Sequence, residues 1–186
     1  MGASAASVTF SGCTALHTIH LDTIATIPSE AFMSLFALSS LYIPNCTSIS
    51  QNALKGCSAL TTLSGPNVAY FGHYNLQSGN MTKELYLPVC SYFGKYALSN
   101  TVLESIYAPA WSTAHASGVF HASHSTTLKY VNLGYAAIPA WFSACVNLNT
   151  FIAEKCTALA AKQFMGDTSL VKVSLPICAT IATQAF

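Results

Sequence analysis

Hydrophobic positions recur along this chain with a period of 22 residues. Every twenty-second residue from Phe10 onward is Phe or Leu: Phe10, Phe32, Leu54, Leu76, Leu98, Phe120, Phe142, Phe164 and Phe186. Self-similarity at such a period is typical of a solenoid, in which each unit buries its apolar face only by stacking on its neighbours. The sequence therefore predicts a single solenoid domain over residues 1–186, with about eight 22-residue repeats starting near 10, 32, 54, 76, 98, 120, 142 and 164.

A second pattern predicts the strands. Six residues after the Phe/Leu column most repeats carry Leu-x-x-Ile-x-Leu, as at Leu16, Ile19 and Leu21, and this alternation is typical of a strand with one buried face. We expect one parallel sheet with strands near residues 16–21, 38–43, 60–64, 84–88, 103–108, 128–133, 148–153 and 170–175. Prolines follow these segments at Pro44, Pro66, Pro88, Pro109 and Pro176. Because proline cannot donate to a ladder, they mark where strand pairing ends.

The spacing is irregular in one stretch. The distance from the Phe/Leu column to the strand is six in most repeats, but Leu98 to Leu103 is five and Phe120 to Leu128 is eight. The register returns at Phe142. Since insertions in solenoids map to loops, often on the binding side, residues 120–127 are predicted to form a protruding loop.

Several segments resemble one known family. Phe10-Ser-Gly-Cys-Thr-Ala-Leu16, Leu54-Lys-Gly-Cys-Ser-Ala-Leu60 and Phe142-Ser-Ala-Cys-Val-Asn-Leu148 are each followed by an Ile/Leu-rich segment, and the whole is similar to BspA-type leucine-rich repeats. The resemblance implies a right-handed leucine-rich-repeat superhelix. It also implies a bacterial or protozoan surface protein used in adhesion, hence a cell-surface or secreted location, without catalytic residues.

The ends of the chain predict a longer assembly. Met1 to Ser7 lacks the charged start and apolar stretch of a secretory signal. Terminal repeats of a solenoid normally carry a polar cap, and neither end shows one. We therefore expect a piece of a longer protein, or a solenoid capped by another subunit, with end-to-end self-association through the uncapped termini.

Composition argues against two classes of partner. Charged residues make up 7% of the chain, where an average domain has about 25%, and there is no arginine. The basic patch that nucleic-acid binding usually needs is missing. No apolar run approaches the ~18 residues of a membrane span, so the periodic hydrophobicity indicates a core and no membrane insertion.

Cysteine and histidine positions offer weak metal or redox signals. Cys13, Cys57 and Cys145 share one column of the repeat, and Cys46, Cys90, Cys156 and Cys178 share another, in columns that elsewhere hold Leu, Ile or Val. The thiols are therefore predicted to be buried, reduced and inert. His115, His121 and His124 lie around the irregular stretch, where they fit either a solvated loop or, less well, a metal site, because no Cys, Asp or Glu completes a ligand set.

No catalytic constellation assembles from the sequence. The six acidic residues fall in different repeats or faces rather than as a pair, and no Gly-rich phosphate loop occurs. We expect no enzyme activity, no cofactor and no resident metal.

The outward positions of the central strands predict a binding surface. Stacking in register brings together Lys83, Glu84, Tyr86, Glu104, Tyr107, Lys129, Tyr130 and Asn132, which hold four of the thirteen charged residues and three tyrosines. Tyrosine is enriched in interface hot spots. The alternative is a self-satisfied ladder, because Lys83, Glu104 and Lys129 alternate in sign within one column. Tyr42 and His20 would extend the same face toward the N-terminus.

Two functions of different classes remain. The first is a binding module that grips a protein or glycan on another cell or matrix. The second is a structural spacer or assembly element, for example of a surface stalk or phage particle, without a ligand of its own.

Overall fold

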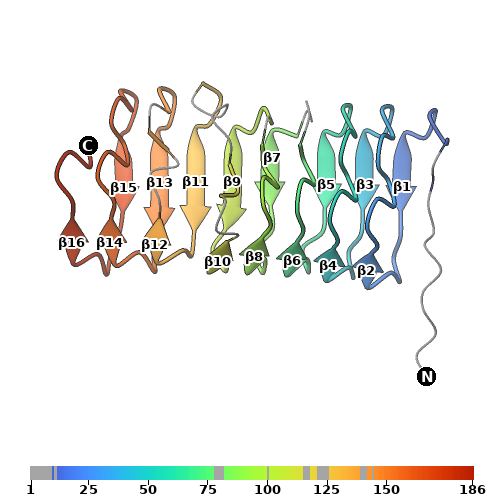
Figure 1. Ribbon diagram of the computed structural model, residues 1–186, viewed down its shortest axis with the longest axis horizontal. Helices are drawn as coiled ribbons and strands as arrows, with labels where there is room; N and C mark the ends of the chain where they lie inside the picture. Colours follow the sequence, from blue (N-terminus) through green and yellow to red (C-terminus); the bar gives the residue numbers. More distant parts are fainter. Residues whose placement is uncertain are drawn as a thin grey trace.

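The chain folds as a solenoid of parallel strands arranged in two rows. The computed structural model describes residues 10, 12–77, 82–99, 101–114, 118–120, 126–138, 142–143 and 145–186. Figure 1 shows the repeats side by side along one axis, with the long strands in one row and the short strands in a second. Every strand pair within each row is parallel. The predicted solenoid is confirmed.

The first row contains the strands that the Leu-x-x-Ile-x-Leu pattern predicts. They are β1 (Thr18–His20), β3 (Ser40–Tyr42), β5 (Thr62–Ser64), β7 (Glu84–Tyr86), β9 (Ser105–Ala108), β11 (Tyr130–Leu133), β13 (Thr150–Ala153) and β15 (Lys172–Ser174). Each lies within its predicted range but most start about two residues later. The N–H groups of Leu16, Leu38 and Leu60 explain this, because each donates back to the carbonyl three residues earlier and not to a neighbouring strand.

The second row corrects the expectation of one sheet. It consists of β2 (Thr26–Ile27), β4 (Ser48–Ile49), β6 (Tyr70–Phe71), β8 (Tyr92–Phe93), β10 (Thr113–Ala114), β12 (Ala137–Ile138), β14 (Ala158–Leu159) and β16 (Thr180–Ile181). Hydrogen bonding divides each row into two sheets. The first row consists of the sheets β1-β3-β5 and β7-β9-β11-β13-β15, and the second of the sheets β2-β4-β6-β8-β10 and β12-β14-β16. Two-residue strands are too short for an alternating sequence pattern to predict. They form because stacking of the repeats places equivalent short segments side by side.

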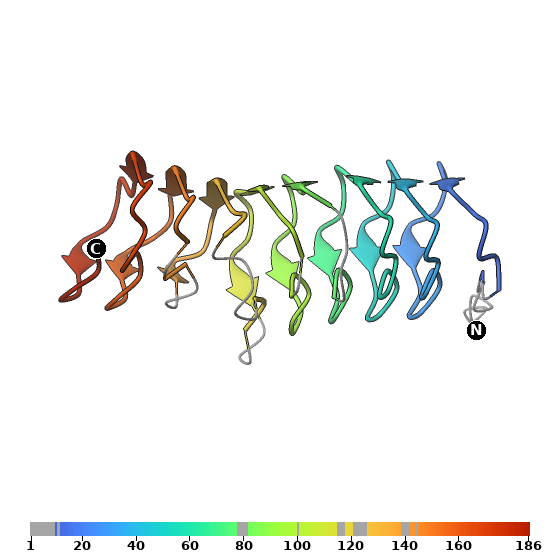
Figure 2. The same cartoon turned by 90° about the horizontal axis from the view of Figure 1, so that it is seen from above.

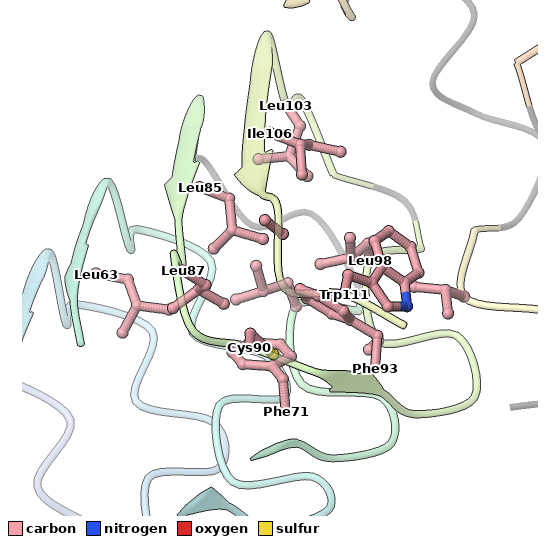
Figure 3. Close-up of a cluster of buried hydrophobic side chains, with 14 of the residues drawn as sticks. Leu63, Phe71, Leu85, Leu87, Cys90, Phe93, Leu98, Leu103, Ile106 and Trp111 are labelled. Atoms are coloured by element: carbon pink, nitrogen blue, oxygen red, sulfur yellow. The ribbon is translucent and has the colours of Figure 1, made fainter. Parts of the chain in front are cut away.

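The core lies between the two rows. Leu41, Leu85 and Ile106 of the first row are at most 1% exposed, and Phe71 and Phe93 of the second are fully buried. Figure 3 shows Leu85, Leu103 and Ile106 toward the first row, Phe71, Phe93 and Cys90 toward the second, and Leu98 beside Trp111. The centroids of the Phe93 and Trp111 rings lie 4.5 Å apart. Figure 2 shows the same two rows from above, one along each side of the solenoid.

Polar side chains connect successive repeats at the surface. Ser39, Thr61 and Thr47 each donate a hydroxyl hydrogen bond to the carbonyl 22 residues earlier, at 3.0 to 3.1 Å. Asn45 and Asn67 donate to carbonyls one repeat back at 2.6 and 2.8 Å. Carbonyls at the surface of the solenoid are thus paired by uncharged side chains, which accounts for a chain with so few ionic groups.

Two columns of left-handed backbone form the turns of each repeat. One contains Glu30, Asn52, Tyr74, Tyr96, Gly118, Lys162 and Gln184, and the other contains Gly12, Ser34, Gly56 and Gly166. Their φ angles run from 51° to 91°. A left-handed conformation costs a residue other than glycine ~1 to 2 kcal/mol, so the described repeats carry this strain at the same place wherever that place holds another residue.

The irregular spacing of the central repeats is confirmed by the strand register. Glu84 pairs with Ser105, Ser105 with Tyr130 and Tyr130 with Thr150, which are separations of 21, 25 and 20 residues in place of 22. The chain therefore gains residues between β9 and β11 and returns to register afterwards. Most of the predicted loop at 120–127, with His121 and His124, lies outside the described residues, and so does His115.

The cysteines agree with the sequence prediction except at the ends of the solenoid. Those whose positions are buried are Cys46, Cys57, Cys90, Cys145 and Cys156, and all seven cysteines are free thiols. Burial raises the pKa of Cys57 to about 11 and those of Cys90 and Cys145 to about 12. Cys13 is exposed and Cys178 is half-buried, so the prediction that all seven are buried is wrong for these two. Both lie in terminal repeats of the described solenoid, where a neighbour covers only one side.

Candidate binding surface

Side chains of β7, β9 and β11, and of the residue that precedes each strand, form the surface that we call the central face. It comprises the eight residues that the sequence analysis selected: Lys83, Glu84, Tyr86, Glu104, Tyr107, Lys129, Tyr130 and Asn132. The strand register aligns them in columns, because Tyr86 pairs with Tyr107 and Tyr107 with Asn132. Glu84 and Tyr130 both pair with Ser105 in a second column.

Two tyrosines of the central face are stacked. The ring centroids of Tyr86 and Tyr107 lie 4.9 Å apart and their planes differ by 8°. Tyr86 is 57% exposed, whereas Tyr107 is half-buried. Each ring uses one face to cover the other, and the stack therefore offers solvent its edges, its hydroxyl groups and the outer face of Tyr86.

Three charged residues next to the stack form a chain of ion pairs. Nζ of Lys83 lies 3.1 Å from Oε1 of Glu104, and Nζ of Lys129 lies 2.6 Å from Oε2. The hydrogen bond from Lys129, followed by that from Lys83, lowers the pKa of Glu104. Both lysine side chains remain more than half exposed. The alternation of sign that the sequence predicted is thus a set of real contacts, and the central face is locally charged but electrically balanced.

Not every predicted residue faces solvent. Asn132 is only 9% exposed, because the register places it between Tyr107 and Ile152, both larger. Its Oδ1 has no hydrogen-bond partner among the described residues. Tyr130 is half-buried and lies in the column of Ser105 and Thr150, apart from the tyrosine stack. Asn132 therefore lies in the outward column, as predicted, but its neighbours leave little of it exposed.

The N-terminal extension of this surface is present. His20, Tyr42 and Ser64 share a column through the pairing of β1, β3 and β5. The His20 and Tyr42 rings lie 5.7 Å apart, and Nε2 of His20 is 2.9 Å from Oδ1 of Asp22. A continuous outward column of aromatic and small polar side chains results.

Sequence reasoning missed a second group of aromatic residues on the other row. The rings of Tyr70 and Tyr92 stack at 4.8 Å with 5° between their planes, on β6 and β8. Tyr74 and Tyr96 lie 6.1 Å apart in the turns that follow these strands. Their 22-residue spacing was visible in the sequence, but the row of strands that aligns them was not predicted.

Neither a metal-binding cluster of side chains nor a membrane-spanning helix occurs among the described residues. Within the described ranges, no group of three or more His, Cys, Asp and Glu side chains is arranged to hold a metal ion. In the same part of the chain, no helix is long and apolar enough to cross a membrane.

Comparison with known families identifies the repeat. A sequence profile described as BspA type leucine-rich repeat region matches in six copies, over residues 4–129 and 69–186. The chain belongs to this family. No curated protein sequence matches it significantly.

Two solved structures are similar to this leucine-rich-repeat chain. A leucine-rich repeat protein from Bacteroides ovatus is 16% identical, with a TM-score of 0.66, over 89% of this chain and 47% of that one. A leucine-rich cell surface protein from Faecalibacterium prausnitzii is 14% identical, with a TM-score of 0.38, over 89% of this chain and 78% of that one. The chain thus spans about half the length of the Bacteroides structure, whose likeness supports the solenoid fold alone.

Proposed function

We propose that this chain is a ligand-binding module of a bacterial cell-surface protein and that the central face binds a protein or glycan on another cell or matrix. Members of the BspA-type family are repeat proteins that act by recognition rather than by catalysis. This is the general property of the fold that supports the proposal. Within this general role, we infer that the specific function of the chain is adhesion.

The observation that carries the proposal is the stacked pair Tyr86–Tyr107 beside the Lys83–Glu104–Lys129 chain. Charged residues make up only 7% of the chain, and four of the thirteen lie on this face together with the stacked aromatic side chains. Aromatic groups with polar tips supply contact area at a low cost in conformational entropy. Because the ion pairs already balance one another, the aromatic edges and hydroxyl groups are the ligand-binding elements and the charges orient the ligand.

The test compares two stacked tyrosine pairs of nearly equal geometry. Tyr86→Ala/Tyr107→Ala removes the stack of the central face, and Tyr70→Ala/Tyr92→Ala removes the matched stack of the second row. On arrays of neutral glycans and extracellular-matrix proteins, the first variant should lose the hits of the wild type while its circular dichroism stays unchanged. Retained hits in the first variant, together with lost hits in the second, would move the site to the other row.

A second candidate function is assembly through the end of the solenoid. Ile181 is 62% exposed and Phe186 61%, whereas Ile49 and Leu54, their equivalents in earlier repeats, are fully buried. We propose that the first repeat of another copy covers this face, because Phe10, Leu16 and Ile24 at the other end are also only partly buried. Sedimentation that stays monomeric at high concentration, or an unchanged oligomer in Ile181→Lys, would contradict this candidate.

A further inference from the structure

The turns after β4, β6 and β8 bring two lysines and two tyrosines together, and we call these four residues the lysine–tyrosine strip: Lys55, Tyr74, Lys95 and Tyr96. Nζ of Lys55 lies 5.7 Å from the centroid of the Tyr74 ring, and Nζ of Lys95 lies 5.1 Å from that of Tyr96. The two rings meet edge to face at 6.1 Å. The strip lies on the turns of the second row, apart from the central face.

Tyr74 and Tyr96 occupy the left-handed turn column of the repeat, on two consecutive turns. Tyr74 and Tyr96 have φ angles of 59° and 51°, in a column where Asn52 and Gly118 adopt the same conformation at lower cost. Neither tyrosine is part of the buried core. The two rings therefore lie on the turns and not in the core, where the ammonium groups of Lys55 and Lys95 contact them.

The strip carries a positive charge that no described carboxylate balances. Glu30 lies in the turn next to that of Lys55, since its backbone N–H donates to the Gln51 carbonyl, but no ion pair joins the two side chains. Among the described residues, the ion pairs involve only His20 with Asp22 and the lysines of the central face with Glu104. Each strip ammonium is held over a ring face by a cation–π contact, and it keeps N–H donors that point elsewhere.

The surroundings add hydrogen-bonding groups. The backbone N–H of Lys95 donates to Nδ1 of His73 at 2.7 Å, which places the proton of a neutral imidazole on Nε2. The ring centroids of His73 and Tyr74 lie 6.2 Å apart. Two phenols, an imidazole and two ammonium groups therefore lie on three consecutive turns.

We propose that the lysine–tyrosine strip binds an acidic polysaccharide, whose carboxylates pair with Lys55 and Lys95 and whose hydroxyls bond to the tyrosines. The two lysines come from turns two strand steps apart, about 10 Å along the solenoid axis. A linear glycan with a carboxylate on each sugar presents anions at repeated intervals of this kind. An ammonium group lies over one face of each ring, and the four residues lie on turns rather than on a strand edge, so the strip suits a hydroxylated polyanion better than an extended peptide.

Titration with polygalacturonate, with dextran as the neutral counterpart, tests the proposal on the whole chain. Isothermal titration at low salt should detect binding of polygalacturonate but not of dextran, and Lys55→Gln/Lys95→Gln should weaken it at least tenfold. Lys155→Gln/Lys172→Gln removes the same charge from exposed lysines elsewhere and should bind as the wild type does. Tyr74→Asn/Tyr96→Asn should also weaken binding severalfold without lowering the melting temperature, because Asn52 already occupies that column.

Each other outcome overturns the proposal. Absence of polygalacturonate binding refutes it, and equal losses in the two lysine pairs reduce it to non-specific charge attraction. Equally tight binding of polyglutamate would indicate an acidic protein as the partner. Equally tight binding of oligothymidylate would indicate a nucleic acid. Tyr86→Ala/Tyr107→Ala should leave polygalacturonate binding unchanged, which separates this inference from the function proposed for the central face.

Discussion

Asn75 is expected to be one of the most sensitive positions in the chain. In other repeats, a main-chain N–H of the Phe/Leu column donates to the carbonyl of the residue before the next column position, as Phe32 N to Ala53 O and Leu76 N to Ala97 O. At Leu54 the side-chain Oδ1 of Asn75 takes the place of that carbonyl, at 3.2 Å. Nδ2 of Asn75 donates in turn to the carbonyls of Ser50 and Gly72 at 3.0 and 3.1 Å.

Asn75→Ala removes all three hydrogen bonds from a fully buried position. The orphaned N–H of Leu54 costs about 1 to 3 kcal/mol, and the two bonds from Nδ2 contribute ~0.5 to 1.5 each, or about 4 kcal/mol in all. For a chain of this size that corresponds to a fall in melting temperature of about 8 to 16 °C.

Asn67→Ala serves as the matched control. Asn67 is exposed and makes one side-chain hydrogen bond, to the Pro44 carbonyl at 2.8 Å, so its loss should cost less than about 1 kcal/mol. Because repeat proteins need not unfold in one step, hydrogen exchange of single amides should be measured in addition to thermal unfolding. The Leu54 amide should exchange faster in Asn75→Ala, with the amide of Leu76 as internal reference. Equal destabilisation by the two substitutions, or an unchanged exchange rate at Leu54, would refute the reasoning.

Three further predictions follow from burial and charge. A thiol reagent should label native Cys13 first and Cys178 next, and rapid labelling of the other five would contradict the core assignment. Burial raises the pKa of Asp167 from 3.8 to about 6, so the protonated carboxyl is favoured in the folded state and its stabilising effect is lost as pH rises from about 4 to 6. Asp167→Asn should therefore raise the melting temperature at neutral pH and flatten its dependence between pH 4 and 6; an unchanged profile would show that this carboxyl is solvated. Ile19→Asp places a charge at a 5% exposed position of β1 and should cost several kcal/mol, which unfolding in denaturant would measure.

The candidate site was predictable in outline because strand register repeats with the sequence period. Lys83, Glu104 and Lys129 fall in one column once the strands are aligned, and their contacts are those that the alternation of sign predicts. Burial of Asn132 was not predictable, because it depends on how far the neighbouring Tyr107 and Ile152 extend over it.

The sequence by itself determined the solenoid, the length of the repeat and the first row of strands. Its apolar columns recur at 22 residues, and such columns are buried only when consecutive repeats stack. Tertiary structure alone decided the second row, since its two-residue strands exist only where a neighbouring repeat supplies hydrogen-bond partners. Tertiary structure also decided that the Leu54 N–H donates to the Asn75 side chain in place of a main-chain carbonyl, and that Lys55 contacts the Tyr74 ring. Those contacts depend on the three-dimensional offset between turns, which a one-dimensional period does not encode.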